Sequence, residues 1–243
     1  MAIEVFNRYE HKYILNAQQY RYMTEGLLSY MDVDAYNRSG EPYTIANLYY
    51  DTDTHELIQR SLEKPVYKEK LRLRAYGVPE EGTKVYLEIK KKYDGLVNKR
   101  RTALYLQEAY AFLQTGVPPS PKLYMNAQVL RELEYFLHLY SLHSVVYIAY
   151  DRMAYFEKDN RDLRISFDQN IRTRRSELRL EAGTHGELLL EPGQYLMEIK
   201  TAFAKPLWLV RMLEECKLYR TSFSKYGTEF KNSLAVGKTA IRA

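Results

Sequence analysis

The sequence predicts an α+β fold in which about eight antiparallel strands form a closed sheet, a β-barrel with a charged interior and flanking helices. Three observations predict it. About eight segments alternate between polar and apolar residues with the period of two that strands have. Few helices interrupt them, and the regular strand–helix alternation of a doubly wound fold is missing. In most of these segments, charged residues occupy one parity and aliphatic residues the other.

The first strand is predicted over residues 5–15, and a helix follows it. Asn16 is suited to cap this helix, because its side chain can accept a backbone hydrogen bond. Apolar or aromatic residues then recur at helical spacing, at Tyr20, Met23, Leu27 and Leu28.

Four further strands are predicted over residues 43–52, 66–76, 83–93 and 96–106. A Gly/Pro turn separates the middle pair, and the dipeptide Asp94-Gly95 separates the last pair, as in a β-hairpin. Two helices, about residues 107–114 and 123–139, surround a proline-rich loop. The pattern then resumes with strands near 144–156, 162–171 and 194–203 and a helix over about 206–217, where Pro206 suits the first turn.

No long low-complexity linker divides the 243 residues. The nearest candidate, residues 115–124, is short and is typical of a loop between helices. We therefore expect a single domain over residues 1–243.

Composition limits the function classes. Lys and Arg number 36 against 31 acidic residues, which gives a net charge of +5, compatible with a polyanionic partner. Cys216 is the only cysteine, so an intramolecular disulfide and a cysteine-based zinc site are excluded, and the five histidines lack zinc spacing. The start lacks the apolar run of a signal peptide, and no window predicts a membrane segment. We expect a cytoplasmic protein.

The stretch "YKEKLRLRAYG" poses the central question about orientation. Its cations share one parity and Leu71, Leu73 and Ala75 the other, the cations being Lys68, Lys70, Arg72 and Arg74. One interpretation is an ordinary strand with its cations in water. The alternative places the cations inside a cavity and the aliphatic residues outside, under helices. Alternation alone does not decide between them.

The same pattern recurs in seven strands, and Glu-x-Lys repeats favour the inward alternative. The face-sharing cations number ten, namely Lys12, Lys70, Arg72, Arg74, Lys90, Lys99, Arg101, Arg152, Arg164 and Lys200. Their matching acids are Glu10, Glu88 and Glu198, which leaves +7 on this face and −2 on the rest of the chain. Enclosing that charge is unfavourable unless an anion enters. The expected anion is a polyphosphate or a nucleoside triphosphate, since arginine suits multidentate phosphate binding.

These segments resemble a known family. "RYEHKYIL", "NLYYDT", "EKPVYKEKLRLRAYG", "LEIKKKYDGLVNKRR", "AYDRMAYF", "LRISFDQNI", "LMEIKT" and "SFSKYG", in this order, are similar to the VTC-type polyphosphate polymerase domain of the CYTH-like triphosphate tunnel metalloenzyme superfamily. The resemblance covers nearly the whole chain. It implies an antiparallel eight-stranded barrel that forms a tunnel. It also implies a transferase that polymerises the γ-phosphate of ATP into inorganic polyphosphate with a divalent metal, Mn²⁺ or Mg²⁺.

Position by position, the resemblance implies roles for single residues. Catalytic roles fall on Lys12, Arg72, Arg74, Lys90, Lys200 and Glu198. Phosphate-binding roles fall on Lys70, Lys99, Arg101, Tyr150, Arg152, Arg164, Ser224 and Lys225. Glu198 is the implied metal ligand, with Glu10 and Glu88 as further candidates that could equally be structural ion-pair partners.

One departure concerns the choice of reaction. The hydrolytic relatives begin with Glu-x-Glu-x-Lys, whereas here Arg8 stands at the first position of that motif. This favours the polymerase branch, with ATP and inorganic polyphosphate as partners. A tripolyphosphate or nucleoside triphosphate hydrolase, and a non-catalytic polyphosphate-binding sensor, stay open as alternatives. Nucleic acid is not expected as a partner, because no RNP-type motif is present. The sequence does not define an oligomeric state.

Overall fold

A computed structural model describes residues 9–94, 96–158 and 162–240, with side chains described to residue 235. In this part of the chain ten strands form a single sheet, and every strand pair is antiparallel. Eight of the strands follow one another in the order β1-β10-β8-β7-β3-β4-β5-β6. The short strands β2 and β9 pair with β7 and β8, beside this path. The predicted antiparallel α+β tunnel fold is confirmed.

The strands run over β1 Tyr9–Leu15, β2 Met31–Val33, β3 Tyr43–Asp51, β4 Tyr67–Tyr76, β5 Lys84–Tyr93, β6 Leu96–Tyr105, β7 His143–Glu157, β8 Arg164–Arg174, β9 Glu187–Leu188 and β10 Tyr195–Thr201. The helices are α1 Ala17–Leu27, α2 Glu56–Leu62, α3 Leu106–Thr115, α4 Ala127–Leu139, α5 Leu207–Glu215 and α6 Lys225–Ala240. In the described part of the chain, no helix is both long and apolar enough to cross a membrane.

Among the described residues the sheet does not close through backbone hydrogen bonds, so the predicted closed barrel is wrong in this respect. Strands β1 and β6 are the two ends of the hydrogen-bonded path and do not pair with each other. A side-chain contact spans this gap instead, because Lys90 Nζ on β5 lies 3.4 Å from Glu10 Oε2 on β1. Alternating residues determine which face of a strand is polar, but they do not determine whether the first and last strands meet.

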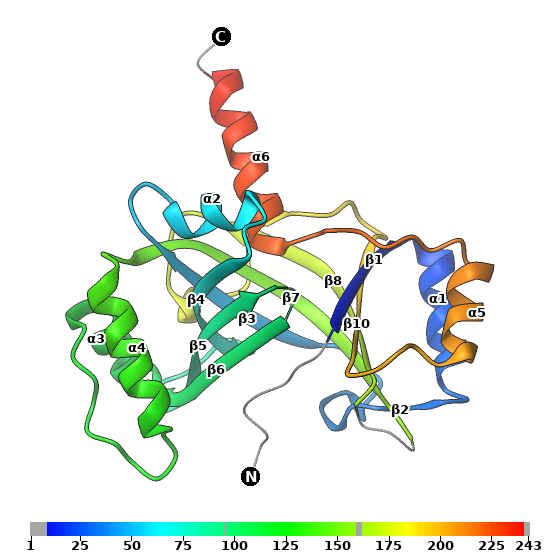
Figure 1. Ribbon diagram of the computed structural model, residues 1–243, viewed down its shortest axis with the longest axis horizontal. Helices are drawn as coiled ribbons and strands as arrows, with labels where there is room; N and C mark the ends of the chain where they lie inside the picture. The colour runs from blue at the N-terminus through cyan, green and yellow to red at the C-terminus, as the bar shows by residue number, and fades with distance from the viewer. Residues whose placement is uncertain (1–8, 95, 159–161, 241–243) are drawn as a thin grey trace.

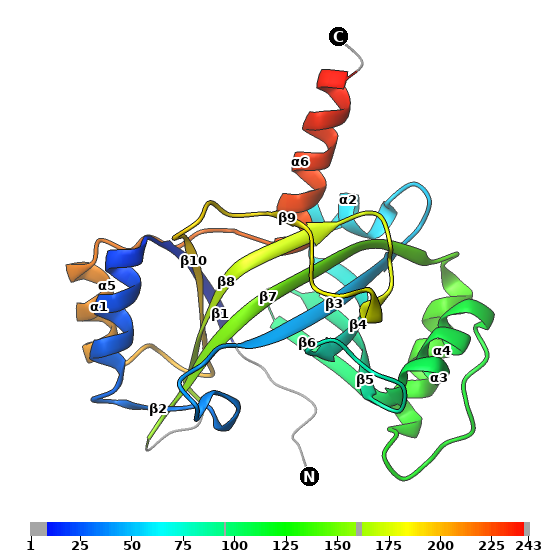
Figure 2. The same ribbon diagram turned by 180° about the vertical axis from the view of Figure 1, so that it is seen from behind.

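The aliphatic faces of the strands point outward and are covered by helices. Leu71 and Leu73 are fully buried in a core formed with α3 and α4. Met197 and Ile199 are fully buried in a second core under α1 and α5. Figures 1 and 2 show these two helix pairs on opposite flanks of the sheet, with α2 and α6 at a third position. The charged residues, which alternate with these aliphatic residues, therefore point into the interior of the curved sheet.

Several element boundaries differ from the prediction. The second helix of the proline-rich region begins at Ala127 rather than 123, because the Asn126 side chain caps it by accepting the Val129 N–H at 3.1 Å. Strands β2 and β9 and helices α2 and α6 were not predicted. Helix α6 is capped by Ser224, whose hydroxyl accepts the Gly227 N–H at 3.3 Å. The predicted start of the first strand, residues 5–8, lies outside the described residues.

Candidate functional site

A cavity of about 260 Å³, here called the inner cavity, lies inside the curved sheet. Strands from every part of the path contribute to it, and the N-terminal end of α6 adds Ser224, Lys225 and Tyr226. Its cations number ten: Lys12, Lys70, Arg72, Arg74, Lys90, Lys99, Arg152, Arg164, Lys200 and Lys225. Two carboxylates, Glu10 and Glu198, line it with them. The cations of the alternating strands thus face inward.

The register of the sheet aligns three lysines across neighbouring strands. Lys70 on β4 is the Cα partner of Lys90 on β5, and Lys90 is the partner of Lys99 on β6. Directly opposed like charges are destabilising. The pKa of Lys99 is lowered to about 8, mainly because the residue is buried. Glu88 raises this pKa, whereas the charges of Arg74, Arg72 and Arg101 lower it.

Lys70 has an unusual environment within this row. Its ammonium donates to the Ser224 hydroxyl at 3.2 Å, and no carboxylate among the described residues forms an ion pair with it. Burial, followed by the charges of Lys90 and other neighbouring cations, lowers its pKa to about 7. Loss of a proton from Lys70 would relieve part of the charge excess of the cavity.

Glu88 forms a buried ion-pair cluster on one wall. Arg72 donates through Nε and Nη2 to Glu88 Oε2 at 2.8 and 2.7 Å. Arg74 Nε lies 3.9 Å from the same oxygen, and Lys99 Nζ lies 3.4 Å from Oε1. Although burial opposes ionisation, Arg74 and Arg72 hold the pKa of Glu88 well below its usual range. Glu88 thereby orients two arginines whose outer edges face the cavity.

Glu198 and Asp168 anchor the opposite wall. Arg152 binds Asp168 with two hydrogen bonds of 2.6 and 2.8 Å and reaches Glu198 at 3.3 Å. Lys225 contacts both carboxylates. Lys12 Nζ lies 3.4 Å from Glu198 Oε1, and Lys200 Nζ lies 3.1 Å from Glu198 Oε2. Four cations therefore surround the Glu198 carboxylate. Burial raises the pKa of Glu198, but these cations, Lys200 foremost, bring it well below the ordinary value.

Lys12 lies between two carboxylates from neighbouring strands. Its ammonium is 3.2 Å from Glu10 Oε1 and 3.4 Å from Glu198 Oε1. Lys90 also contacts Glu10, and these cations outweigh burial and hold the pKa of Glu10 well below its usual range. Glu10 is therefore ionised at neutral pH.

Tyr150 supplies a hydroxyl in the wall. Arg74 Nη2 donates to this hydroxyl at 3.2 Å, and Arg152 lies with its guanidinium 5.1 Å from the ring centroid. Burial alone would raise the pKa of Tyr150, but Arg74, Arg152 and Lys225 lower it.

The carboxylates of Glu10 and Glu198 fit a divalent metal whose remaining ligands are substrate oxygens. In the described part of the chain, no three His, Cys, Asp or Glu side chains converge as a ready metal site. Glu10 and Glu198 nevertheless approach the same ammonium group, and both are ionised. Magnesium is commonly held by one or two carboxylates together with substrate phosphates. Glu88 lies on the other wall, is fully buried and does not line the inner cavity, which supports its structural alternative.

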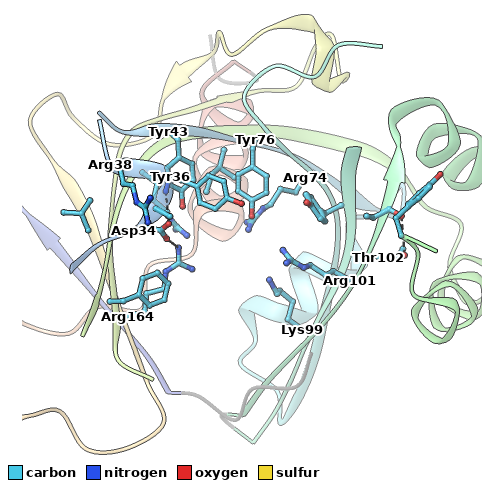
Figure 3. A pocket seen from close by; sticks show the side chains of 18 of the residues that line it. Asp34, Tyr36, Arg38, Tyr43, Arg74, Tyr76, Lys99, Arg101, Thr102 and Arg164 are labelled. Atoms are coloured by element: carbon cyan, nitrogen blue, oxygen red, sulfur yellow. Dashed lines mark hydrogen bonds and ion pairs between the residues drawn. The ribbon is translucent and has the colours of Figure 1, made fainter. Parts of the chain in front are cut away.

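A second, larger cavity of about 1260 Å³, here called the mouth, adjoins the inner cavity. Arg74, Lys99, Arg152 and Arg164 line both. Arg101 lines only the mouth, where its guanidinium lies 4.8 Å from the Tyr86 ring centroid. Arg164 donates to Asp34 Oδ2 at 3.2 Å. Figure 3 shows Lys99 and Arg101 directed into this space, with tyrosine rings across from them.

The structure brings fifteen of the sixteen predicted site residues to the inner cavity or its supporting ion pairs and places Arg101 in the mouth. Sequence reasoning missed Asp168 and Asp34. Asp168 shares the parity of Arg164 and Ser166 on β8, so the same argument could have found it. Asp34 lies in a loop with no periodic pattern, and no comparable signal pointed to it.

The fold is shared with proteins of known structure. A putative adenylate cyclase from Bacillus halodurans matches with a TM-score of 0.54 and 14% identity, covering 91% of this chain and 96% of the other. A putative adenylyl cyclase from Hippeastrum, described as having a dominant triphosphatase activity, matches with a TM-score of 0.52 and 13% identity, covering 95% and 96%. These likenesses show the fold.

The family follows from the sequence match. The VTC domain model matches residues 7–233, and the chain belongs to this family. Vacuolar transporter chaperone complex subunit 4 of Trypanosoma brucei brucei (strain 927/4 GUTat10.1) is 26% identical over 205 residues, which is 70% of this chain. The match spans 26% of the length of that relative.

Proposed function

We propose that this chain transfers the γ-phosphate of ATP to the end of an inorganic polyphosphate chain inside the inner cavity, with a divalent metal, Mn²⁺ or Mg²⁺. The observation that carries the proposal is the charge of that cavity. Ten cations line it and, with the buried Glu88 and Asp168 included, four carboxylates oppose them. Membership of the VTC domain family supports the same conclusion.

The proposed reaction needs positioning and charge neutralisation more than covalent help. An oxygen of the acceptor's terminal phosphate attacks the γ-phosphorus of ATP and forms a P–O bond. The bond from the γ-phosphorus to the β–γ bridging oxygen breaks, and ADP leaves with that electron pair. Arg72 and Arg74, held by Glu88, present fixed donors to the transferring group. Glu10 and Glu198 would hold the metal, which when bound neutralises phosphate charge.

The other predicted residues have supporting roles in this proposal. Lys12, Lys90 and Lys200 act with the two arginines on the transferring phosphate. The remaining positions bind the phosphate chain, namely Lys70, Lys99, Arg101, Tyr150, Arg152, Arg164, Ser224 and Lys225. Lys225 and Ser224 lie at the start of α6, where a helix N-terminus favours anions.

The test is incubation of the protein with ATP and Mn²⁺ or Mg²⁺, followed by gel separation of polyphosphate and quantification of ADP. We expect a ladder of long chains and one ADP for each phosphate incorporated. Lys90→Met, which removes an inward cation, should lose most of the product. Lys91→Met is the matched control, because Lys91 is the next residue on β5 and lines neither cavity.

Two alternatives have distinct outcomes in the same experiment. The Hippeastrum neighbour, described as a triphosphatase, favours a hydrolase as the second candidate. Free phosphate without chains would establish hydrolysis. Tight polyphosphate binding without ATP consumption would establish a sensor.

A further inference from the structure

The mouth contains a cluster of tyrosines that phosphate binding does not require. Tyr36 and Tyr76 are parallel, with ring centroids 6.1 Å apart and an interplanar angle of 4°. Tyr43 lies 5.7 Å from Tyr36 and 6.1 Å from Tyr76, and Tyr86 meets Tyr76 edge-on at 5.7 Å. Figure 3 shows the labelled rings of Tyr36, Tyr43 and Tyr76 gathered on one side of the mouth. Separate segments of the chain thus converge to build one aromatic surface.

Two of these rings are open to solvent, whereas Tyr43 is partly buried against a hydrophobic core. Tyr36 is 73% exposed and Tyr76 is 41% exposed. Tyr36 lies in a short 3-10 helix over Ala35–Asn37, whose start is capped by the Asp34 side chain through the Tyr36 N–H at 3.1 Å. Asn37, next to it, is fully buried and donates to the Arg152 carbonyl at 2.9 Å. The exposed ring therefore stands on a segment that is fixed to the cavity wall.

The two cavities differ in the size of ligand that each can hold. The inner cavity, about 260 Å³, is smaller than the roughly 300–1,000 Å³ of pockets for drug-sized ligands, whereas the mouth has about 1260 Å³. A triphosphate group in the inner cavity would leave the sugar and base outside it. Arg74 and Arg164 line both cavities, so a ligand that starts among the inner cations continues into the mouth.

We propose that Tyr36, supported by Tyr43 and Tyr76, binds the nucleobase of a nucleoside triphosphate by stacking. The proposal rests on the proposed function, because it assigns the nucleoside end of the same substrate. Stacking uses the π-face that every base has. The mouth therefore favours a nucleoside triphosphate over bare tripolyphosphate and discriminates weakly among bases. Tyr76 follows Arg74 at the end of β4, whereas Lys70 precedes Arg74 on the same strand. With the base at the tyrosine rings, the γ-phosphate of the nucleotide is therefore directed toward Lys70.

The test measures binding of two ligands by calorimetry, a non-hydrolysable ATP analogue and tripolyphosphate. Tyr36→Ala should weaken binding of the ATP analogue by about 5- to 100-fold. The affinity for tripolyphosphate should stay within about twofold of the wild-type value. The second variant, Tyr76→Leu, keeps an apolar side chain and should weaken the analogue less. Tyr135→Ala is the control, since Tyr135 is 69% exposed on α4 and lines neither cavity. A GTP analogue should follow the ATP analogue in every variant.

Several outcomes would overturn the assignment. Unchanged binding of the ATP analogue in Tyr36→Ala, or an equal loss for both ligands, would show that the ring does not contact the base. The protein could instead bind a single-stranded RNA oligomer, and Tyr36→Ala could abolish that binding while ATP binding stays intact. This result would assign the aromatic surface to RNA. If the wild-type protein binds neither triphosphate, the proposed function itself fails, which is a separate result.

Discussion

Lys70 Nζ donates a hydrogen bond to Ser224 Oγ at 3.2 Å, and among the described residues no carboxylate forms an ion pair with this ammonium. Ser224 in turn caps α6 by accepting the Gly227 N–H. This contact joins the row of cavity lysines to the helix that closes one side of the inner cavity. Because Lys70 has no carboxylate partner among the described residues, an entering anion would supply its counter-charge.

Lys70→Met should stabilise the empty protein and weaken anion binding. The substitution removes a buried cation from beside Lys90 and Lys12, so we expect the free energy of unfolding to rise by at least about 1 kcal/mol, since one pKa unit corresponds to about 1.4 kcal/mol. Affinity for tripolyphosphate should fall about tenfold or more. Denaturant unfolding and calorimetry measure the two effects. Lys12→Met is the contrast, because it leaves Glu10 and Glu198 with less compensation and should destabilise the protein.

Binding of tripolyphosphate should depend on pH through Lys70. Its pKa in the empty cavity is lowered to about 7, and a bound anion raises it. Affinity is therefore greatest below about pH 7 and falls as pH rises through that value, by at most one log unit per pH unit from this group. At pH 8, calorimetry in buffers of different ionisation enthalpy should detect proton uptake on binding. Lys70→Met should reduce that uptake, and an unchanged uptake would contradict the role of Lys70.

The same pKa has a consequence for stability without ligand. The unfolded chain binds a proton at Lys70 up to the ordinary lysine pKa of about 10.4, whereas the folded protein releases it near pH 7. In the window between these values the unfolded state binds more protons, so stability contributed by this group increases with pH. Urea unfolding at pH 6.5 and pH 9 should show that trend in the wild type and a smaller one in Lys70→Met.

Glu88→Gln should destabilise the empty protein strongly. Arg72, Arg74 and Lys99 would lose their buried counter-charge, and removal of one partner from a buried ion pair costs about 3–5 kcal/mol. Tripolyphosphate should then raise the melting temperature by more in the variant than in the wild type, because the anion replaces the missing charge. An equal thermal shift in both proteins would show that the ligand does not reach this wall.

Glu10→Gln separates metal binding from phosphate binding. The change removes a negative charge from the cavity wall beside Lys12 and Lys90. Tripolyphosphate binding in the presence of EDTA should therefore become tighter, whereas turnover with limiting Mn²⁺ should fall at least about tenfold, as expected when a metal ligand is lost. If Glu10→Gln weakened tripolyphosphate binding and turnover to the same extent, Glu10 would have a purely structural role.

The alternation of charged and aliphatic residues was enough to predict the antiparallel sheet and the placement of its cations on one face of the strands. Leu73 and Arg74 illustrate why, since adjacent residues on β4 must point to opposite faces. The choice between interior and solvent depended on the repeated Glu-x-Lys pairs and the excess of arginine, because alternation does not show which face the helices cover. The open edge between β1 and β6 could not be predicted, since it depends on sheet curvature rather than on side-chain parity.

The site was less predictable where it depends on loops. Asp34 and Tyr36 lie in an irregular segment, and only folding brings them to Arg164 and Tyr76. The pairing of Lys70 with Ser224 joins residues separated by 154 positions, and α6 had no predicted start. The pattern gave the directions of single side chains, and the register and the loops determine their partners.

The most direct measurement of the central claim is a crystal structure with tripolyphosphate bound. Density for the phosphate chain should run through the inner cavity, in contact with Lys70, Arg72 and Lys200, with one end directed toward the mouth. An empty inner cavity, with tripolyphosphate bound only on the outer surface of the sheet, would contradict the account.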